Sequence, residues 1–219
     1  MKTALIIGST GLIGSHLLEL LLDSAQYEKV ITFVKRDSGI SHPKLTQHII
    51  DFDKPETYKD LVIGDDFFCT IGTTIKKAGS KEAFRKVDFE YPSQFATLAS
   101  QNKVKKYLII SSLGADGSSG NFYLKTKGEI QDFLKKCNFE SISILQPSLL
   151  LGNRTEFRLG EKVGAFFMKA FAFLLVGKLK KYKPIESTVV AKALFKIAQK
   201  NTPGFEIYES DIIEKIGGR

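Results

Sequence analysis

The chain of 219 residues contains no tryptophan, two cysteines and three histidines. Cys69 and Cys137 lie far apart and form no C-x-x-C pair, so we interpret them as small buried side chains in a reducing cytoplasm. The histidines show no metal-ligand spacing with acids or cysteines, and we expect no metal site. Lys2 leads directly into an apolar run, and nothing before that run resembles a targeting segment. These features predict a cytoplasmic protein without a bound metal.

Linkers and membrane-spanning stretches are also missing from the sequence. No Pro/Gly/Ser-rich segment divides the chain, and 43% hydrophobic residues suffice to bury one large core. We therefore expect a single domain over residues 1–219, with residues 149–184 forming its substrate side. The very apolar residues 164–178 within that region are interrupted by Lys169 and are too short to span a bilayer. They could pack on the body, cover an apolar substrate, make a homodimer contact or attach peripherally to a membrane.

Positive charge is in excess, with a formal net charge of +8. The lysines cluster in short groups, at residues 76–77, 103–106, 135–136 and 178–183. Groups spread over loops and helix ends are typical of a solvated surface rather than a nucleic-acid groove, and no RNA- or DNA-binding motif accompanies them. The basic balance also suits a polyanionic cofactor. We therefore expect a small-molecule ligand and no nucleic acid.

The pattern that organises the chain lies in residues 3–22, TALIIGSTGLIGSHLLELLL. A short apolar run predicts a buried strand, Gly8, Gly11 and Gly14 follow at G-x-x-G-x-x-G spacing, and the leucines after them predict a buried helix. A glycine turn lets the backbone approach a ligand closely, and the free N–H groups of the new helix favour an anion. An ordinary tight turn is the alternative. Placement between strand and helix favours a dinucleotide site.

Strand and helix patterns alternate along the rest of the chain. Strands are predicted at residues 29–35, 45–50, 67–71, 107–110, 142–145 and, at an edge, 205–208. Helices are predicted at residues 81–99 with an interruption at Pro92, at 121–137 and at 187–199, and the last three residues are expected to fray. The alternation predicts an α/β Rossmann fold, a doubly wound and mainly parallel sheet of about seven strands with helices on both faces.

Basic residues follow the second predicted strand, at the position that faces the adenosine ribose in a dinucleotide fold. An acid there accepts the 2′-OH of NAD, whereas a basic residue accommodates the 2′-phosphate of NADP. The pair here is Lys35–Arg36, although a solvated strand end is the alternative. Charge-assisted bonds contribute about 1.5–3 kcal/mol each, which predicts a tenfold to hundredfold preference for NADPH over NADH.

Two further strand ends carry residues suited to a cofactor. Asp51 and Phe52 end the third strand, where they would border the adenine. Gly72, Thr73 and Thr74 follow the fourth strand, which indicates either close approach of the backbone to a ligand or a capped turn.

Tyr123 and Lys127 lie four residues apart on the helix predicted over 121–137, one turn above the other. Lowering a tyrosine pKa from about 10 to about 7 takes about 4 kcal/mol, and a lysine ammonium about 5 Å away supplies about 3 kcal/mol. Lys127 could therefore prepare Tyr123 to donate or accept a proton while Ser112 holds a carbonyl oxygen. Ser111 is the rival for that role, and a structural strand-end hydroxyl is the third alternative.

Taken together, GSTGLIG, the Ser-Ser strand end and YLKTK resemble the short-chain dehydrogenase/reductase superfamily. The run IGTTIKKAGSKEAFRKVDFEY, followed by SSLGADGSSGNFYLKTKGE, is similar to an atypical NAD(P)H-binding branch, the one that includes the Tat-interacting-protein oxidoreductase. Recognisable blocks cover residues 8–158. The resemblance implies a Rossmann fold with NADPH as the cofactor.

The resemblance also implies roles for individual residues. The residues along the diphosphate would be Ser9, Thr10, Gly11, Leu12 and Ile13. Lys35 and Arg36 would contact the 2′-phosphate, and Ile71 and Gly72 would border the adenosine side. Tyr123 and Lys127 would reach the nicotinamide ribose and the reacting carbonyl. Leu150, just after Pro147, would pass the nicotinamide, and Arg158 matches a cofactor-contacting arginine of the branch.

These patterns predict an NADPH-dependent oxidoreductase that reduces a carbonyl or related group of a small, partly apolar substrate. Its catalytic residues would be Tyr123, Lys127 and Ser112. The alternative is a regulatory or scaffold protein that binds NADPH without turnover, although such a protein would need only the phosphate and adenosine contacts. A nucleic-acid-binding protein is a third hypothesis and predicts steeply salt-dependent binding.

Overall fold

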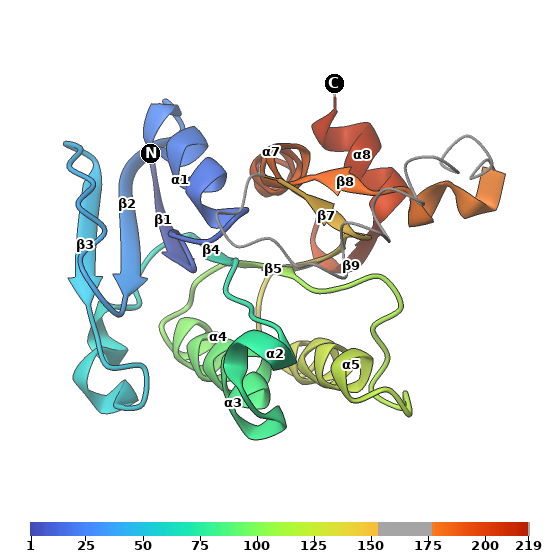
Figure 1. Cartoon of the computed structure of the whole chain (residues 1–219). Helices are drawn as coiled ribbons and strands as arrows, with labels where there is room; N and C mark the ends of the chain where they lie inside the picture. Colours follow the sequence, from blue (N-terminus) through green and yellow to red (C-terminus); the bar gives the residue numbers. More distant parts are fainter. Residues whose placement is uncertain (153–176, 219) are drawn as a thin grey trace.

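The computed structural model describes residues 1–152 and 177–218. Arg158 and most of the apolar residues 164–178 lie outside the described residues, as does the central part of the predicted substrate side, residues 149–184. Figure 1 shows the described elements in sequence colours.

Seven strands form one sheet in the order β3-β2-β1-β4-β5-β6-β9. They are β1 (Lys2–Ile7), β2 (Tyr27–Val34), β3 (Leu45–Ile49), β4 (Asp66–Cys69), β5 (Lys106–Ile110), β6 (Ser141–Gln146) and β9 (Gly204–Glu209). Every neighbouring pair is parallel, which confirms the predicted Rossmann fold and places β9 at the edge as predicted. Because all strands run the same way, their carboxyl ends meet at a single edge of the sheet.

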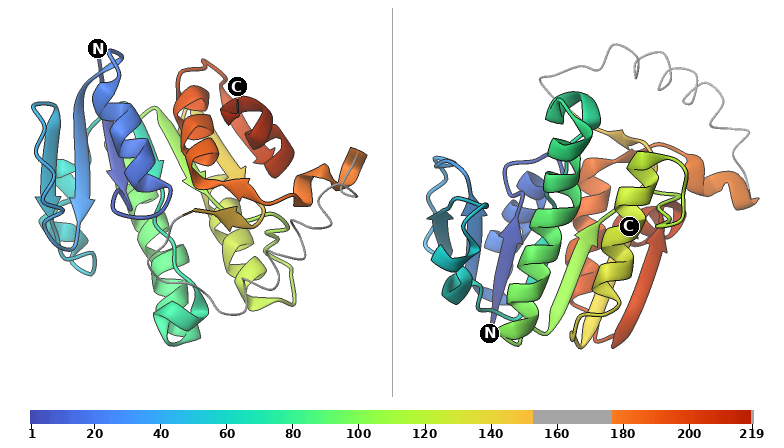
Figure 2. Two further views of the ribbon diagram at one scale, coloured as in Figure 1. Left: turned by 45° about the horizontal axis from the view of Figure 1, so that its top comes forward. Right: turned by 90° about the horizontal axis from the view of Figure 1, so that it is seen from below.

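Helices cover both faces of this sheet (Figure 1, Figure 2). One face carries α1 (Gly14–Asp23), α7 (Ser187–Ala198) and α8 (Ser210–Gly217), and the other carries α3 (Lys81–Arg85), α4 (Tyr91–Gln101) and α5 (Phe122–Leu134). In β1, Ala4 and Ile6 face the first set of helices, and Leu5 and Ile7 face the second. The alternation expected of a strand therefore supplies both hydrophobic cores.

The remaining elements are short. They are α2 (Ile75–Ala78), the 3-10 turns η1 (Pro55–Thr57), η2 (Lys59–Leu61) and η5 (Gly177–Tyr182), and the strands β7 (Leu150–Leu151) and β8 (Ile185–Glu186). The strands β7 and β8 pair in parallel as a separate two-stranded sheet. Sequence patterns missed these pieces because each is too short to show a period.

Phe95 of α4 is the centre of the second core, where it is fully buried among aromatic rings. Its ring centroid lies 5.2–5.6 Å from those of Phe33, Phe52, Tyr58 and Phe67. We expect Phe95→Ala to lower the free energy of unfolding by about 3–5 kcal/mol, because it removes these contacts and leaves a cavity. Chemical denaturation measures this loss. The control Ile207→Ala, on the exposed edge strand at 44% exposure, is expected to cost less than about 1 kcal/mol, and equal losses would contradict the prediction.

A widened helical turn precedes Pro92. The π-helical turn η3 (Lys86–Glu90) connects α3 to α4, and Pro92 is the second residue of α4. Since proline has no N–H to donate to the carbonyl of Asp88, the regular helical pattern cannot run through this point. The predicted interruption is confirmed. Asp88 lies within the widened turn and is 1% exposed.

Several lysines are used to cap the carboxyl ends of helices. Lys44 Nζ donates to two carbonyls at the end of α1, at 2.9 and 2.7 Å. Lys106 Nζ donates to two carbonyls at the end of α7, at 3.0 and 2.6 Å, and Lys196 Nζ to one in the last turn of α8, at 3.1 Å. Cations are favourable at this end of a helix dipole. Part of the excess positive charge therefore stabilises the fold by capping helices.

The expectation of a frayed C-terminus is wrong for Gly217. This residue is buried as the last residue of α8, and a Cβ added to it would lie 2.0 Å from the carbonyl oxygen of Val189 in α7. The glycine therefore allows α8 to pack closely on α7. The sequence predicted a flexible end because the presence of a glycine does not indicate which atoms pack against its backbone.

Candidate functional site

The predicted glycine turn joins β1 to α1 beside the end of β4. Gly8 has φ +83°, and a Cβ added to it would lie 2.5 Å from the backbone nitrogen of Ile71. A Cβ at Gly14 would lie 2.0 Å from the carbonyl oxygen of Gly8. Both positions therefore require glycine. The turn lies between β1 and β4. The strands that follow β1 are added toward one edge of the sheet and those that follow β4 toward the other edge, and open α/β sheets bind ligands where the strand order reverses in this way.

The amino end of α1 is free of competing side chains. Its N-cap residue, Ile13, makes no side-chain capping bond, and the first turn contains no acid. Thr10 and Gly11 are exposed beside it, Leu12 is half-buried, and Ser9 is buried. Because the first N–H groups of a helix have no partner within the helix, this end can accept an anion such as a diphosphate.

The end of β4 is tied to the end of β1 through Thr70. Its backbone nitrogen and its Oγ1 both donate to the carbonyl oxygen of Ile7, at 3.0 and 2.9 Å. Gly72 follows as an exposed residue, and the backbone nitrogen of Thr73 donates to Asp88 Oδ2 at 2.9 Å. The structure therefore brings the predicted residues Ile71, Gly72 and Thr73 beside the glycine turn.

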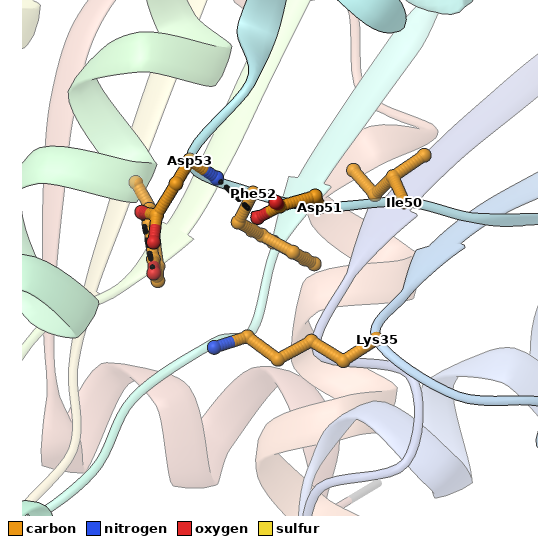
Figure 3. A pocket seen from close by; sticks show the side chains of 6 residues that line it. Lys35, Ile50, Asp51, Phe52 and Asp53 are labelled. Atoms are coloured by element: carbon orange, nitrogen blue, oxygen red, sulfur yellow. Dashed lines mark hydrogen bonds between the residues drawn. The ribbon is translucent and has the colours of Figure 1, made fainter.

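A cavity of about 290 Å³ opens beyond the ends of β2 and β3. It is lined by Lys35, Ile50, Asp51, Phe52, Asp53 and Tyr91. Lys35 Nζ lies 5.6 Å from the ring centroid of Phe52 and 5.1 Å from that of Tyr91, and Figure 3 shows the lysine extended alongside Phe52. The next residue, Arg36, is exposed. The predicted adenine-side residues Asp51 and Phe52 thus share one cavity with Lys35.

Two lining residues that the sequence did not indicate, Asp53 and Tyr91, form one wall of this cavity. The Asp53 carboxylate accepts from Lys86 Nζ at 2.8 Å and from the Tyr91 hydroxyl at 3.0 Å. The hydrogen bond from Lys86 and that from Tyr91 lower the pKa of Asp53 below its usual range. Asp53 could have been predicted as a cavity residue because it directly follows Asp51 and Phe52 in the sequence. No sequence pattern indicated Tyr91, which comes from a helix on the far side of the cavity.

Tyr123 stands on the first turn of α5. Asn121 caps this helix, and its side-chain oxygen accepts from the backbone nitrogen of Tyr123 at 3.0 Å and from that of Leu124 at 3.2 Å. The half-buried Tyr123 ring packs against Phe84 of α3, with centroids 5.5 Å apart. The cap stabilises the start of α5, and the ring contact holds the Tyr123 side chain against α3.

Lys127 is buried one turn further along α5, at 6% exposure. Its Nζ lies 2.7 Å from Asp88 Oδ1 in an ion pair. Burial lowers the pKa of Lys127, but the attraction of the Asp88 carboxylate opposes burial, and the pKa is raised overall. A Cβ added to Gly72 would lie 3.4 Å from Asp88 Oδ1 and 3.8 Å from Lys127 Nζ. The ion pair therefore lies directly behind the exposed backbone of Gly72.

Asp88 is a further residue of the candidate site that sequence reasoning missed, in addition to Asp53 and Tyr91. The sequence argument treated Lys127 as a lone positive charge, whereas the structure gives it a carboxylate partner. A signal was present, because Asp88 falls four residues after Phe84 on the apolar side of its helix. A carboxylate on a buried stripe requires a cation or hydrogen-bond donors.

The two serines at the end of β5 differ in their surroundings. The Ser111 hydroxyl is buried, accepts from Gln131 Nε2 at 2.6 Å and donates to the Lys127 carbonyl at 3.4 Å. Ser112 is half-buried, and its carbonyl accepts from Ala115 N at 3.1 Å. The bonds of Ser111 tie β5 to α5, which favours Ser112 as the serine available to a substrate.

The segment after β6 returns to the glycine turn. The carbonyl of Pro147 accepts from the backbone nitrogen of Leu113 at 3.0 Å, and Leu150 begins β7. A Cβ added to Gly152 would lie 2.8 Å from Leu12 Cδ1. The predicted residues Pro147 and Leu150 therefore lie on a segment that reaches the glycine turn, and Arg158 lies outside the described residues.

Metal sites and membrane spans were searched for in the same part of the chain. Among residues 1–152 and 177–218, no group of three or more His, Cys, Asp or Glu side chains could hold a metal ion. Within these residues, too, no helix has the length and apolar character needed to cross a membrane.

The described residues fit a dinucleotide along the carboxyl edge of the sheet. The glycines Gly8 and Gly14 and the uncapped end of α1 suit the diphosphate, and the aromatic cavity beside Lys35 suits the adenosine. Tyr123 and Lys127 lie at the end of β5, where the other half of a dinucleotide would extend.

Comparison with known proteins agrees with this geometry. The profile of a protein family described as NAD(P)H-binding matches residues 8–168. Protein FMP52, mitochondrial, from Candida albicans is 34% identical over 97% of this chain and 93% of its own length. Protein HTATIP2 from Rattus norvegicus is 31% identical over 99% of this chain and 89% of its own length.

Solved structures show the same fold at low sequence identity. A UDP-N-acetylglucosamine 4-epimerase from Methanobrevibacter ruminantium matches with a TM-score of 0.69 and 17% identity, over 95% of this chain and 76% of that one. A short-chain dehydrogenase/reductase superfamily protein from Agrobacterium tumefaciens, with bound NAD, matches with a TM-score of 0.69 and 13% identity, over 94% of this chain and 77% of that one. At these identities the likeness concerns the fold.

Proposed function

This chain belongs to the NAD(P)H-binding family of atypical short-chain dehydrogenases/reductases, and we propose that it is an NADPH-dependent oxidoreductase that reduces a carbonyl or related group of a small, partly apolar substrate. The observation that carries this proposal is the position of Tyr123 and of the buried Lys127 at the same sheet edge as the glycine turn. A protein that only binds the cofactor has no need of this second half of the site.

The proposed binding contacts follow the order of the strands. The amino end of α1 holds the diphosphate, and the cavity beside Phe52 holds the adenine. Lys127, behind Gly72, holds the nicotinamide ribose by its ammonium N–H groups. Residues at Pro147 and Leu150 line the nicotinamide side.

The proposed chemistry divides between cofactor and protein. The hydride for the carbonyl carbon would be supplied by NADPH when it is bound. The Tyr123 hydroxyl donates its proton to the carbonyl oxygen, so that the product is an alcohol, and the tyrosine regains a proton from solvent. Ser112 donates a hydrogen bond to the same oxygen and stabilises the charge that develops there. Ser111, bonded to α5, supports the position of Lys127.

We propose that Arg36 carries most of the preference for NADPH. Lys35 Nζ lies over two aromatic rings in the adenine cavity, whereas Arg36 is exposed at the end of β2 and can meet the 2′-phosphate with its planar guanidinium. Calorimetry with the wild-type protein is expected to show a tenfold to hundredfold preference for NADPH over NADH. Arg36→Ala should remove most of that preference, and Lys35→Met should weaken both cofactors by a similar factor.

Lys29→Met is the matched control, because Lys29 is exposed at the opposite end of the same strand. It also lowers the net charge by one, and its NADPH affinity should equal that of the wild type. A preference that survives Arg36→Ala would contradict the assignment to Arg36. Failure of the wild-type protein to bind either cofactor would overturn the proposed function, and binding without turnover of any carbonyl compound would favour a regulatory or scaffold role.

Location and partners form a separate proposal. We propose a cytoplasmic protein from its unpaired cysteines, Cys69 and Cys137, while the name of the Candida albicans relative places that protein in mitochondria. Imaging of the tagged full-length chain distinguishes the two locations. A small-molecule substrate held by residues 149–184, and a homodimer, are further expectations, and light scattering tests the second.

A further inference from the structure

Asp37 is the first acid after β2 and directly follows Arg36. An acid at this point of a dinucleotide fold accepts the 2′-OH of NAD and repels the 2′-phosphate of NADP. In this structure the exposed Asp37 carboxylate is bonded to the protein itself. Its Oδ1 accepts from the backbone nitrogen of Gly39 at 2.9 Å and from Gln47 Nε2 at 2.6 Å. The carboxylate is therefore directed toward β3, the edge strand that contains Gln47.

Gln47 holds the loop after β2 by both polar atoms of its amide. Its Nε2 donates to Asp37, and its Oε1 accepts from the backbone nitrogen of Ser38 at 3.2 Å. In the pairing of β2 with β3, Gln47 lies opposite Thr32, two residues before the end of β2. The chain must therefore turn back after β2 for Asp37 and Ser38 to reach this amide. Arg36 lies at that turn, directly before the residues that Gln47 holds.

The two acids that line the neighbouring cavity, Asp51 and Asp53, also have partners. Lys54 Nζ lies 3.5 Å from Asp51 Oδ2, and Lys86 Nζ lies 2.8 Å from Asp53 Oδ2. In the described part of the chain, no ion pair involves Arg36. These acids are therefore paired with lysines, whereas the Arg36 guanidinium is available to an anion.

We propose that Gln47 is a positioning residue for cofactor specificity, because it holds the Asp37 carboxylate toward β3 and so keeps it from the ribose. This inference rests on the proposed function, in which Arg36 contacts the 2′-phosphate. With Asp37 held, the guanidinium binds the phosphate without an opposing carboxylate. Release of Asp37 would return a negative charge to that position, which weakens NADPH binding and offers an acceptor to the 2′-OH of NADH.

The test compares NADPH and NADH binding to Gln47→Met by calorimetry. Methionine keeps the length of the side chain, but it has no N–H to donate to Asp37 and is a weak acceptor for Ser38. The ratio of NADPH affinity to NADH affinity should fall by about fivefold relative to the wild type. A ratio within about twofold of the wild-type ratio would overturn the proposal.

Asp37→Asn separates release of the charge from loosening of the loop. Asparagine keeps an oxygen to accept from Gly39 and Gln47, so this single variant should keep the wild-type affinity ratio. In the double variant Gln47→Met/Asp37→Asn no charge is released, and the ratio should return to within about twofold of the wild type. A ratio that stays low in the double variant would overturn the proposal, because the loss would then come from the loop alone.

Gln26→Met is the matched control, because it makes the same change at an exposed residue just before β2 begins, at the opposite end of that strand. Its affinity ratio should equal that of the wild type. A fall in the ratio that Gln26→Met reproduces would overturn the assignment to Gln47.

A measurement without cofactor tests the contact itself. Hydrogen bonds from Gly39 and Gln47 lower the pKa of the Asp37 carboxyl, so Gln47→Met should raise that pKa toward its usual range. Carbon-13 shifts of the side-chain carboxyl measure the pKa, and Asp37→Asn identifies the signal. An unchanged pKa would overturn the proposal without bearing on the proposed function. Failure of the wild-type protein to bind either cofactor would instead overturn the proposed function, and this inference with it.

Discussion

Replacement of Tyr123 by phenylalanine is expected to lower carbonyl reduction by about 10²- to 10⁴-fold, the usual contribution of a positioned proton donor. The ring contact with Phe84, 5.5 Å between centroids, does not involve the hydroxyl and should remain. NADPH affinity should therefore stay close to the wild-type value, and the loss should fall on kcat. The measurement is NADPH oxidation with a substrate found by screening small carbonyl compounds.

Tyr208→Phe is the control for this experiment. Tyr208 is half-buried on the edge strand β9, outside the proposed site, and the loss of its hydroxyl should leave turnover unchanged. If Tyr123→Phe keeps wild-type turnover on a confirmed substrate, Tyr123 is not the proton donor. If neither the wild type nor the variant turns over any carbonyl compound while both bind NADPH, the regulatory alternative gains support.

The second large effect is expected at Gly14, where α1 begins. In Gly14→Ala the new Cβ would lie 2.0 Å from the Gly8 carbonyl oxygen and 2.6 Å from Thr70 Oγ1. The first of these is a backbone atom, so the helix must move away from the turn. Overpacking of this kind costs about 1–3 kcal/mol, and because we propose that the same backbone binds the diphosphate, NADPH affinity should fall by about a hundredfold. Calorimetry measures the affinity, and thermal unfolding the stability.

Gly120→Ala provides the matched control, because a Cβ at Gly120 meets nothing within 4 Å. Its NADPH affinity and stability should equal those of the wild type. Wild-type affinity in Gly14→Ala would mean that the diphosphate is bound elsewhere than at the amino end of α1.

Much of the cofactor side was determined by local sequence. A glycine turn between a buried strand and a buried helix indicated the position of Gly8 and Gly14, and both glycines prove to be sterically required. The alternation of strands and helices implied a parallel sheet, whose carboxyl ends share one edge. Residues far apart in sequence, such as Lys35 and Tyr123, could therefore be assigned to the same edge without coordinates.

Local sequence also determined that Tyr123 and Lys127 lie on one side of a helix, because residues four apart face the same way. It determined the interruption at Pro92, because proline cannot donate a backbone hydrogen bond. These features depend on a few neighbouring residues, and the tertiary fold did not change them.

The tertiary structure decided which charges meet. Asp88 and Lys127 come from different helices, and their pairing follows from how the widened turn before α4 packs against α5. The tertiary structure also places Lys35 over the rings of Phe52 and Tyr91, and it places lysines such as Lys106 at the carboxyl ends of helices, which they cap. Hydrophobic periodicity states which face of an element is buried, but it carries no information on which partner lies opposite. The electrostatics of this site are therefore a property of the packed fold.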